Sequence, residues 1–196
     1  MSNSTPLALR LLPHGLTALR LALAPAIFEL ILAGRGLATA GCLAVAMATD
    51  AADGPLARRH GVASRAGAWF DVWTDFLVIE AAFAGFAVAG VGPWAVPVFA
   101  ALSFALFAAT ARVTPRFQDP VGKNIGGILM GAAFAVVASR DLMLAEAAFA
   151  VAIAALCATM AGRVLFALAG QASSAATPGS TLPSIHSRKA PPAVET

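Results

Sequence analysis

Long apolar runs separated by short polar segments dominate the chain. Six runs can be drawn, at about 16–34, 37–53, 67–88, 94–112, 125–139 and 142–169. An α-helix needs about 20 apolar residues to cross the hydrocarbon core of a bilayer, and most of these runs are close to that length. Glycine-rich or proline-containing segments separate them, such as Gly34-Arg35-Gly36 and Gly54-Pro55. The pattern predicts an all-α integral membrane bundle of about six transmembrane helices.

The end of the chain has a different pattern. From Gln171 onward it is rich in Ser, Thr, Pro and Ala and has few bulky apolar residues. Such a segment cannot bury enough apolar surface to fold. We therefore expect one six-helix membrane domain over residues 1–170, followed by a disordered C-terminal tail over residues 171–196.

Composition supports the membrane class. Hydrophobic residues make up 59% of the 196 residues and charged residues 12%, against about 45–50% and 25% in an average soluble protein. Mean hydropathy is +0.81. So few charges cannot cover a soluble globule of this size, and soluble and disordered classes are excluded. The formal charge of +3 is typical of cytoplasmic loops, so we expect no nucleic-acid partner.

The positive charges also predict an orientation. With the N-terminus in the cytoplasm, Arg35 and Arg140 are the only basic residues in the outer loops of a six-span protein. This positive-inside asymmetry predicts a bacterial inner-membrane protein whose basic loop at 56–66 faces the cytoplasm. A cleaved signal peptide over residues 1–40 is the disfavoured alternative, because its removal would leave five spans with inverted loops.

Four aspartates flank that basic loop. Asp50 and Asp53 are three residues apart near the end of the second run, and Asp71 and Asp75 are four apart near the start of the third. Side chains at these spacings share one face of a helix. Since a short loop joins the two helix ends, both pairs are expected at the same depth on the cytoplasmic side.

Four converging carboxylates need compensating positive charge. Two of them about 5 Å apart repel by roughly 3 kcal/mol at an effective dielectric constant near 20. Hard divalent cations with oxygen ligands offset this repulsion best, and two carboxylate pairs suit two Mg²⁺ or Mn²⁺ ions. The sequence favours a metal site over the alternative, a salt-bridge cluster.

Small residues between the two pairs suggest a second ligand. Gly54 follows Asp53 directly, and Gly67 precedes Asp71 by one helical turn. Ala57 is also small, and Arg58 can donate a fork of hydrogen bonds to a diphosphate. A metal-bound diphosphate at a membrane surface predicts transfer between a diphosphate-activated or nucleotide-activated lipid and a polar acceptor.

This segment has the form D-x2-D-G-x2-A-R-x8-G-x3-D-x3-D and resembles the signature of the CDP-alcohol phosphatidyltransferases at all eight specified positions. The resemblance implies an integral membrane enzyme of phospholipid biosynthesis, commonly a homodimer. Such an enzyme transfers a phosphatidyl group from CDP-diacylglycerol to a polar alcohol and releases CMP. It also implies that Asp50, Asp53 and Asp71 bind metal, that Asp75 is both a metal ligand and the general base, and that four residues contact the CDP moiety: Gly54, Ala57, Arg58 and Gly67.

Two further segments partly resemble relatives of phosphatidylglycerophosphate synthase. Pro13, Leu16, Thr17 and Arg20 fit an N-terminal Pro-Asn-x-Leu-Thr-x-x-Arg pattern, but His14 replaces the Asn. A Gly-Lys-x-Lys-Thr motif is reduced to Gly122-Lys123-Asn124-Ile125-Gly126, which weakens the case for glycerol 3-phosphate as the acceptor. Arg112, Arg116 and Lys123 either form a phosphate-binding cluster or are ordinary positive-inside residues.

Two other classes remain open. A UbiA-type intramembrane prenyltransferase also uses Asp-rich motifs and Mg²⁺, but its motifs are much farther apart than Asp53 and Asp71. A non-catalytic membrane relative would account for the altered motif near Lys123, although it would have no need to keep all four aspartates.

Overall fold

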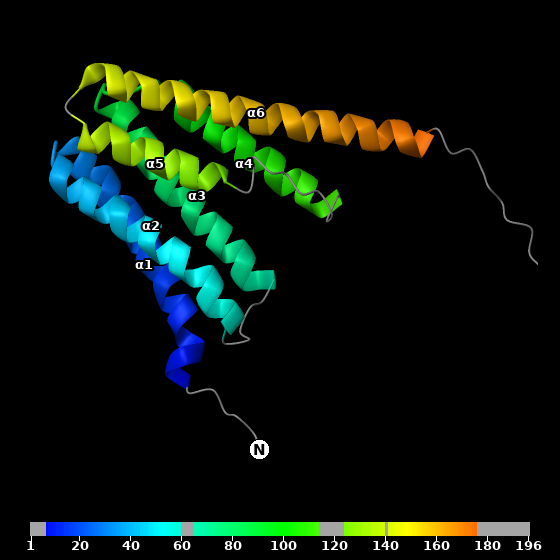
Figure 1. The fold of residues 1–196 in the computed structure, drawn as a ribbon, viewed down its shortest axis with the longest axis horizontal. Coiled ribbons are helices and arrows are strands. Elements are labelled where there is room, and N and C mark those ends of the chain that lie inside the picture. The colour runs from blue at the N-terminus through cyan, green and yellow to red at the C-terminus, as the bar shows by residue number, and fades with distance from the viewer. Residues whose placement is uncertain (1–6, 60–64, 114–123, 140, 176–196) are drawn as a thin grey trace, which may run out of the picture.

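The chain folds into helices, as the sequence predicts. A computed structural model describes residues 7–59, 65–113, 124–139 and 141–175. These residues form six helices and no strand (Figure 1). The helices are α1 (Leu7–Leu32), α2 (Gly36–Arg59), α3 (Arg65–Val88), α4 (Ala95–Val113), α5 (Ile125–Ala138) and α6 (Leu142–Ala175). The all-α prediction is confirmed for this part of the chain.

The helices pack in two groups. The first helix, α1, lies against α2 and α3, and the last, α6, lies against α4 and α5 (Figure 1). Contacts of α2 with α5 and of α3 with α4 and α5 join the groups. Side chains such as Ile27, Leu43, Val78, Phe83 and Leu156 are fully buried along these contacts. The ends of α2 and α3 that carry the aspartates therefore have α1 on one side and the second group on the other.

Glycines in the left-handed region end two of the helices. Gly34 has a φ of 65° after α1, and Gly90 has a φ of 73° after α3. The Arg35 amide donates to the Leu30 carbonyl at 2.9 Å, and the Val91 amide donates to the Phe86 carbonyl at the same distance. Each bond spans the glycine at the end of its helix, a position whose positive φ favours glycine. The predicted turn at Gly34-Arg35-Gly36 is thus found.

Two predicted boundaries are wrong. The second helix does not stop at Gly54-Pro55 but continues to Arg59, although a proline inside a helix costs about 3 kcal/mol. The last helix continues past the predicted end of the sixth run at about residue 169 to Ala175. The segment 171–175 has two alanines and no Gly or Pro to stop it. The rest of the predicted tail, 176–196, lies outside the described residues.

The membrane bundle is supported only in part. Two helical segments of the described chain are long and apolar enough to cross a membrane, Gly15–Leu32 in α1 and Leu142–Phe166 in α6. The site carboxylates interrupt the apolar character of α2 and α3. The fifth helix has 14 residues, about 21 Å at 1.5 Å per residue, which is shorter than a hydrocarbon core of about 30 Å. Six helices are present, and six membrane spans remain a prediction.

Candidate functional site

An arginine lies within the buried face of α1. The buried residues of this helix recur at intervals of three and four, as Thr17, Arg20, Ala24, Ile27 and Ile31. This spacing forms one stripe along the helix, and the stripe packs against α2 and α3. Arg20 is 0% exposed. A fully buried guanidinium requires hydrogen-bonding partners with negative charge.

Three of the four predicted aspartates supply those partners. Nη1 of Arg20 donates to Asp75 and, at 3.3 Å, to Asp50, while Nη2 donates to Asp71. The carboxylates come from α2 and α3, so one side chain of α1 connects three helices. The Asp side chains are 43%, 32% and 24% exposed at Asp50, Asp71 and Asp75. The predicted convergence of the two helix ends is therefore found, with solvent access to each of these carboxylates.

Other predicted site residues lie at the same ends. Asp53, Gly54, Ala57 and Arg58 belong to the last turns of α2, but their side chains and surroundings lie outside the described part of the structure. Gly67 is exposed in the first turn of α3. The structure thus brings Asp50, Asp71 and Asp75 together and leaves the arrangement of the predicted CDP contacts open.

The charges around Arg20 do not balance. Three described carboxylates share one guanidinium, so that with all three ionised these four side chains carry an excess of two negative charges. Their oxygens are the donors that Mg²⁺ and Mn²⁺ prefer, so the residues fit a hard divalent cation. In the described residues, no group of three or more acidic, His or Cys side chains is already spaced to hold a metal ion. The arrangement there is the salt-bridge cluster that the sequence disfavoured.

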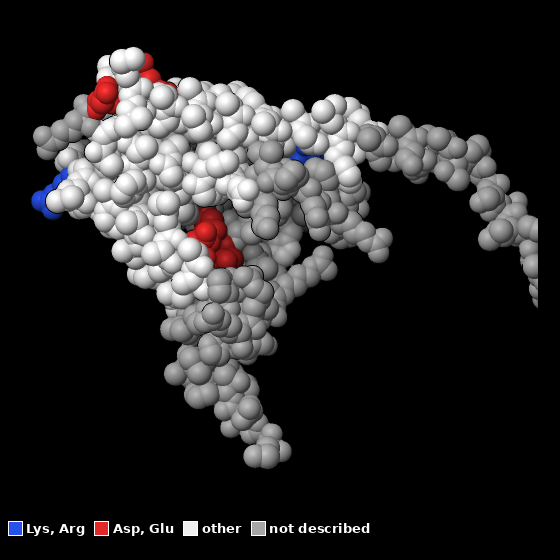
Figure 2. Space-filling view, viewed as in Figure 1, with Lys and Arg blue, Asp and Glu red and all other residues white. Residues whose placement is uncertain are grey.

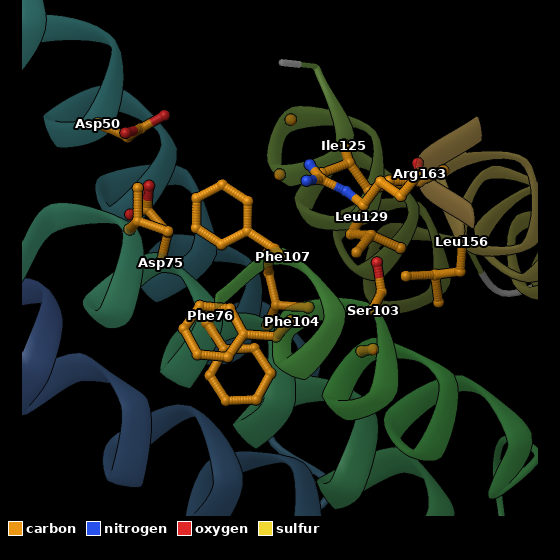
Figure 3. Close-up of a pocket in the computed structure, with 16 residues that line it drawn as sticks. Asp50, Asp75, Phe76, Ser103, Phe104, Phe107, Ile125, Leu129, Leu156 and Arg163 are labelled. Carbon is orange, nitrogen blue, oxygen red and sulfur yellow. The ribbon is translucent and has the colours of Figure 1, made fainter. Parts of the chain in front are cut away.

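A cavity of about 300 Å³ begins at this cluster. Asp50 and Asp75 lie together on one side of it, and Arg163 lies on the other side beside Ile125 and Leu129 (Figure 3). Acidic atoms are visible in a hollow near the middle of the face drawn in Figure 2. The volume is at the lower end of the range for ligand pockets, which fits a small polar molecule.

Aromatic rings from α3 and α4 form the wall between the two polar sides. Phe76 stacks on Phe104 with 4.2 Å between the ring centroids, and Trp73 packs edge-on against Phe104 at 4.6 Å. Phe107 contacts Trp69 at 5.5 Å and separates Asp75 from Arg163 (Figure 3). These rings therefore lie between the carboxylates and Arg163 (Figure 3).

Two features that attract anions meet on the far side of the cavity. Arg163 of α6 is 8% exposed, lies 4.9 Å over the Phe107 ring and donates to Thr110 at 3.4 Å. The first turn of α5 contributes Gly126 and Gly127 to the same lining. Amides in the first turn of a helix have no partner within the helix and carry the positive end of its dipole. This side of the cavity suits a phosphate or a carboxylate.

Arg20 and Arg163 belong to the site but were not predicted from the sequence as site residues. Arg20 appeared only in a partial motif, although its place in an apolar stripe of period three and four could have indicated a buried charge. Arg163 sits within a long apolar run in the same way. Arg112 has its backbone in α4 and His14 its backbone in α1, but their side chains lie outside the described residues, as do Arg116 and Lys123 entirely.

The comparisons with known proteins agree with the resemblance seen in the sequence. The family model described as CDP-alcohol phosphatidyltransferase matches residues 10–177, which is most of the chain. Neither the curated proteins nor the solved structures gave a significant match. The matched range includes all six helices almost completely and the whole Asp cluster.

Proposed function

This chain belongs to the CDP-alcohol phosphatidyltransferase family and is therefore a phosphotransferase, and we propose that it transfers a phosphatidyl group from CDP-diacylglycerol to a polar alcohol, with release of CMP. The observation that carries the proposal is that Asp50, Asp75 and Arg163 line one and the same cavity. A reaction between an activated diphosphate and a small acceptor needs such a site, with carboxylates on one side and an acceptor pocket beside them.

In this proposal the aspartates hold divalent metal. Proteins of this family generally depend on divalent cations. Asp50, Asp53, Asp71 and Asp75 would hold two Mg²⁺ or Mn²⁺ ions, which neutralise charge on the diphosphate and so favour departure of CMP. Gly54, Ala57, Arg58 and Gly67 would contact the CDP moiety, because small residues at these helix ends leave room for a nucleotide backbone.

Asp75 is the proposed general base. Its carboxylate lines the cavity, so it can accept the proton of an acceptor hydroxyl that lies there. The acceptor oxygen then forms a bond to the β-phosphorus of CDP-diacylglycerol. The bond from that phosphorus to the oxygen of the CMP leaving group breaks. The products are the phosphatidyl alcohol and CMP, and the proton stays on Asp75 until it passes to water.

The acceptor would carry an anionic group. Arg163 can bind a phosphate with two parallel hydrogen bonds, and the first turn of α5 adds amide donors from the adjoining wall. The aromatic wall would place the acceptor between this anchor and Asp75. Alcohol phosphates such as glycerol 3-phosphate fit this description. The proposed phosphate-binding residue, Arg163, belongs to α6. It is therefore not part of the reduced Gly-Lys-x-Lys-Thr motif, which lies before and at the start of α5.

The proposal also includes location and assembly. The apolar helices α1 and α6 support a membrane protein, and we place it in a bacterial inner membrane with the carboxylates facing the cytoplasm. Large exposed apolar side chains are numerous among the described residues, including Leu37, Trp94 and Leu165. They would lie against lipid or against a second copy in a homodimer.

The direct test measures nucleotide release. The purified protein in lipid nanodiscs is given CDP-diacylglycerol, Mg²⁺ and matched pairs of acceptors: glycerol and glycerol 3-phosphate, inositol and inositol phosphate. We expect CMP to form with a phosphorylated acceptor and a phosphatidyl product to appear in equal amount. A parallel assay supplies a prenyl diphosphate as the donor. Release of diphosphate from it would establish the prenyltransferase alternative, and no turnover of either donor would support a non-catalytic relative.

Replacing the cavity arginine should affect the acceptor and not the donor. In Arg163→Met we expect the KM for the phosphorylated acceptor to rise roughly 10- to 100-fold, because a charge-assisted hydrogen bond is worth about 1.5–3 kcal/mol. The KM for CDP-diacylglycerol should stay close to that of the unmodified protein. Arg35→Met, which alters an exposed arginine between α1 and α2, is the matched control. Equal effects on both substrates would contradict the assigned role.

A further inference from the structure

We infer that Arg20 is an internal counter-ion that weakens the binding of divalent metal to the carboxylate cluster, and that it thereby makes metal binding depend on the anionic nucleotide substrate. The inference rests on the proposed function, because it takes the Asp cluster to be the metal site. Arg20 of α1 would then regulate the affinity for metal of carboxylates that belong to α2 and α3.

The position of the guanidinium is the first observation. Arg20 is completely buried, and its two terminal nitrogens reach carboxylates on two neighbouring helices. In the absence of metal, this contact satisfies the carboxylates and limits their mutual repulsion. The cluster is therefore stable without a bound cation, although it keeps a negative charge.

The choice of oxygen atoms is the second observation. Arg20 contacts Oδ1 of Asp50, Asp71 and Asp75. Each carboxylate has a second oxygen, which is a possible metal ligand. The guanidinium and a metal ion can thus share the same three side chains, and like charge would then oppose metal binding.

A diphosphate changes this balance. A diphosphate bound beside the cation would add negative charge there, and so would offset the repulsion between the cation and the guanidinium. Metal and nucleotide then bind more tightly together than either binds alone, and by thermodynamic linkage each raises the affinity of the other by the same factor. If Arg20 only positioned the carboxylates, its replacement would have the opposite effect. The metal ligands would then be less well ordered, and metal would bind more weakly.

The experiment measures Mn²⁺ binding to the whole protein in nanodiscs by electron paramagnetic resonance, with and without CDP. We expect the unmodified protein to bind Mn²⁺ weakly alone and roughly tenfold or more tightly with CDP. Arg20→Met should bind Mn²⁺ at least about tenfold more tightly than the unmodified protein without CDP, and CDP should add little. Arg20→Lys, which keeps the charge, should stay near the unmodified protein, as should the control Arg35→Met.

Thermal unfolding provides a second readout. Without metal, Arg20→Met should melt at a lower temperature, because three carboxylates lose their partner, and Mn²⁺ should raise its Tm by more than it raises that of the unmodified protein. Arg20→Gln, which is neutral but can still donate hydrogen bonds, serves if the Met variant does not fold.

The outcomes separate the two proposals. Mn²⁺ binding in the neutral Arg20 variants that is equal to or weaker than in the unmodified protein would overturn the counter-ion role and leave the metal site intact. Absence of Mn²⁺ binding in the unmodified protein, with and without CDP, would overturn the metal site and the proposed function with it.

Discussion

Asp75→Asn is expected to lower turnover about 10²- to 10⁴-fold, the usual contribution of a general base. The amide is the same size as the carboxylate and keeps one oxygen that can bind metal, but it cannot accept the proton of the acceptor hydroxyl. Asp75 lines the cavity where the acceptor is proposed to lie. Affinity for CDP should fall far less than turnover, because the other three aspartates still hold metal against the diphosphate.

The comparison with Asp50→Asn makes this prediction specific. Asp50 of α2 lines the same cavity, and its side chain is more exposed than that of Asp75 of α3; its proposed role is to bind metal. Its amide variant should lose metal affinity, CDP affinity and turnover together. Glu29→Gln, an exposed site on α1, is the control for loss of an acidic charge. The division of roles is wrong if Asp75→Asn loses CDP binding as completely as Asp50→Asn, or if it retains near-normal turnover.

Removal of divalent metal is expected to reduce CMP release by roughly 10³-fold or more, because charge neutralisation by a cation is worth several kcal/mol in the transition state. Added Mg²⁺ or Mn²⁺ should restore the rate. The metal-free protein should stay folded, since Arg20 compensates part of the charge of the cluster.

Two controls separate metal loss from damage. EDTA saturated with Mg²⁺ before addition should have no effect on CMP release, and the Tm of the chelated protein should show that it is still folded. Turnover that survives thorough chelation would exclude a metal-dependent reaction, and the Asp cluster would then be only the salt-bridge cluster seen around Arg20.

The residues that bring the carboxylates together could be predicted from the sequence. Asp50 and Asp53, and likewise Asp71 and Asp75, are a helical turn apart, and the helices that carry them are joined by the short segment 60–64. Convergence then follows from helix geometry and loop length alone, because both are local properties of the chain. The family could be predicted for the same reason, since its signature lies within this one segment.

Helix boundaries were less well predicted where the signal was a single residue. Gly54-Pro55 was interpreted as the end of a helix, but α2 continues to Arg59. The prediction of six membrane spans is met by length and composition only in α1 and α6. The aspartates make α2 and α3 less apolar, and α5 is short.

The sequence by itself determined that the chain is helical, that it belongs to this family and that the two aspartate pairs converge, which the structure shows for Asp50, Asp71 and Asp75. Only the tertiary structure decided what stands opposite them. Arg20 lies 30, 51 and 55 residues from its three partners, and Arg163 lies 53 residues from Thr110. The contacts that give these two arginines their place in the site come from helices far away in the sequence. These contacts are fixed by which helices pack together, and that depends on the summed burial of many side chains, not on any spacing within one helix.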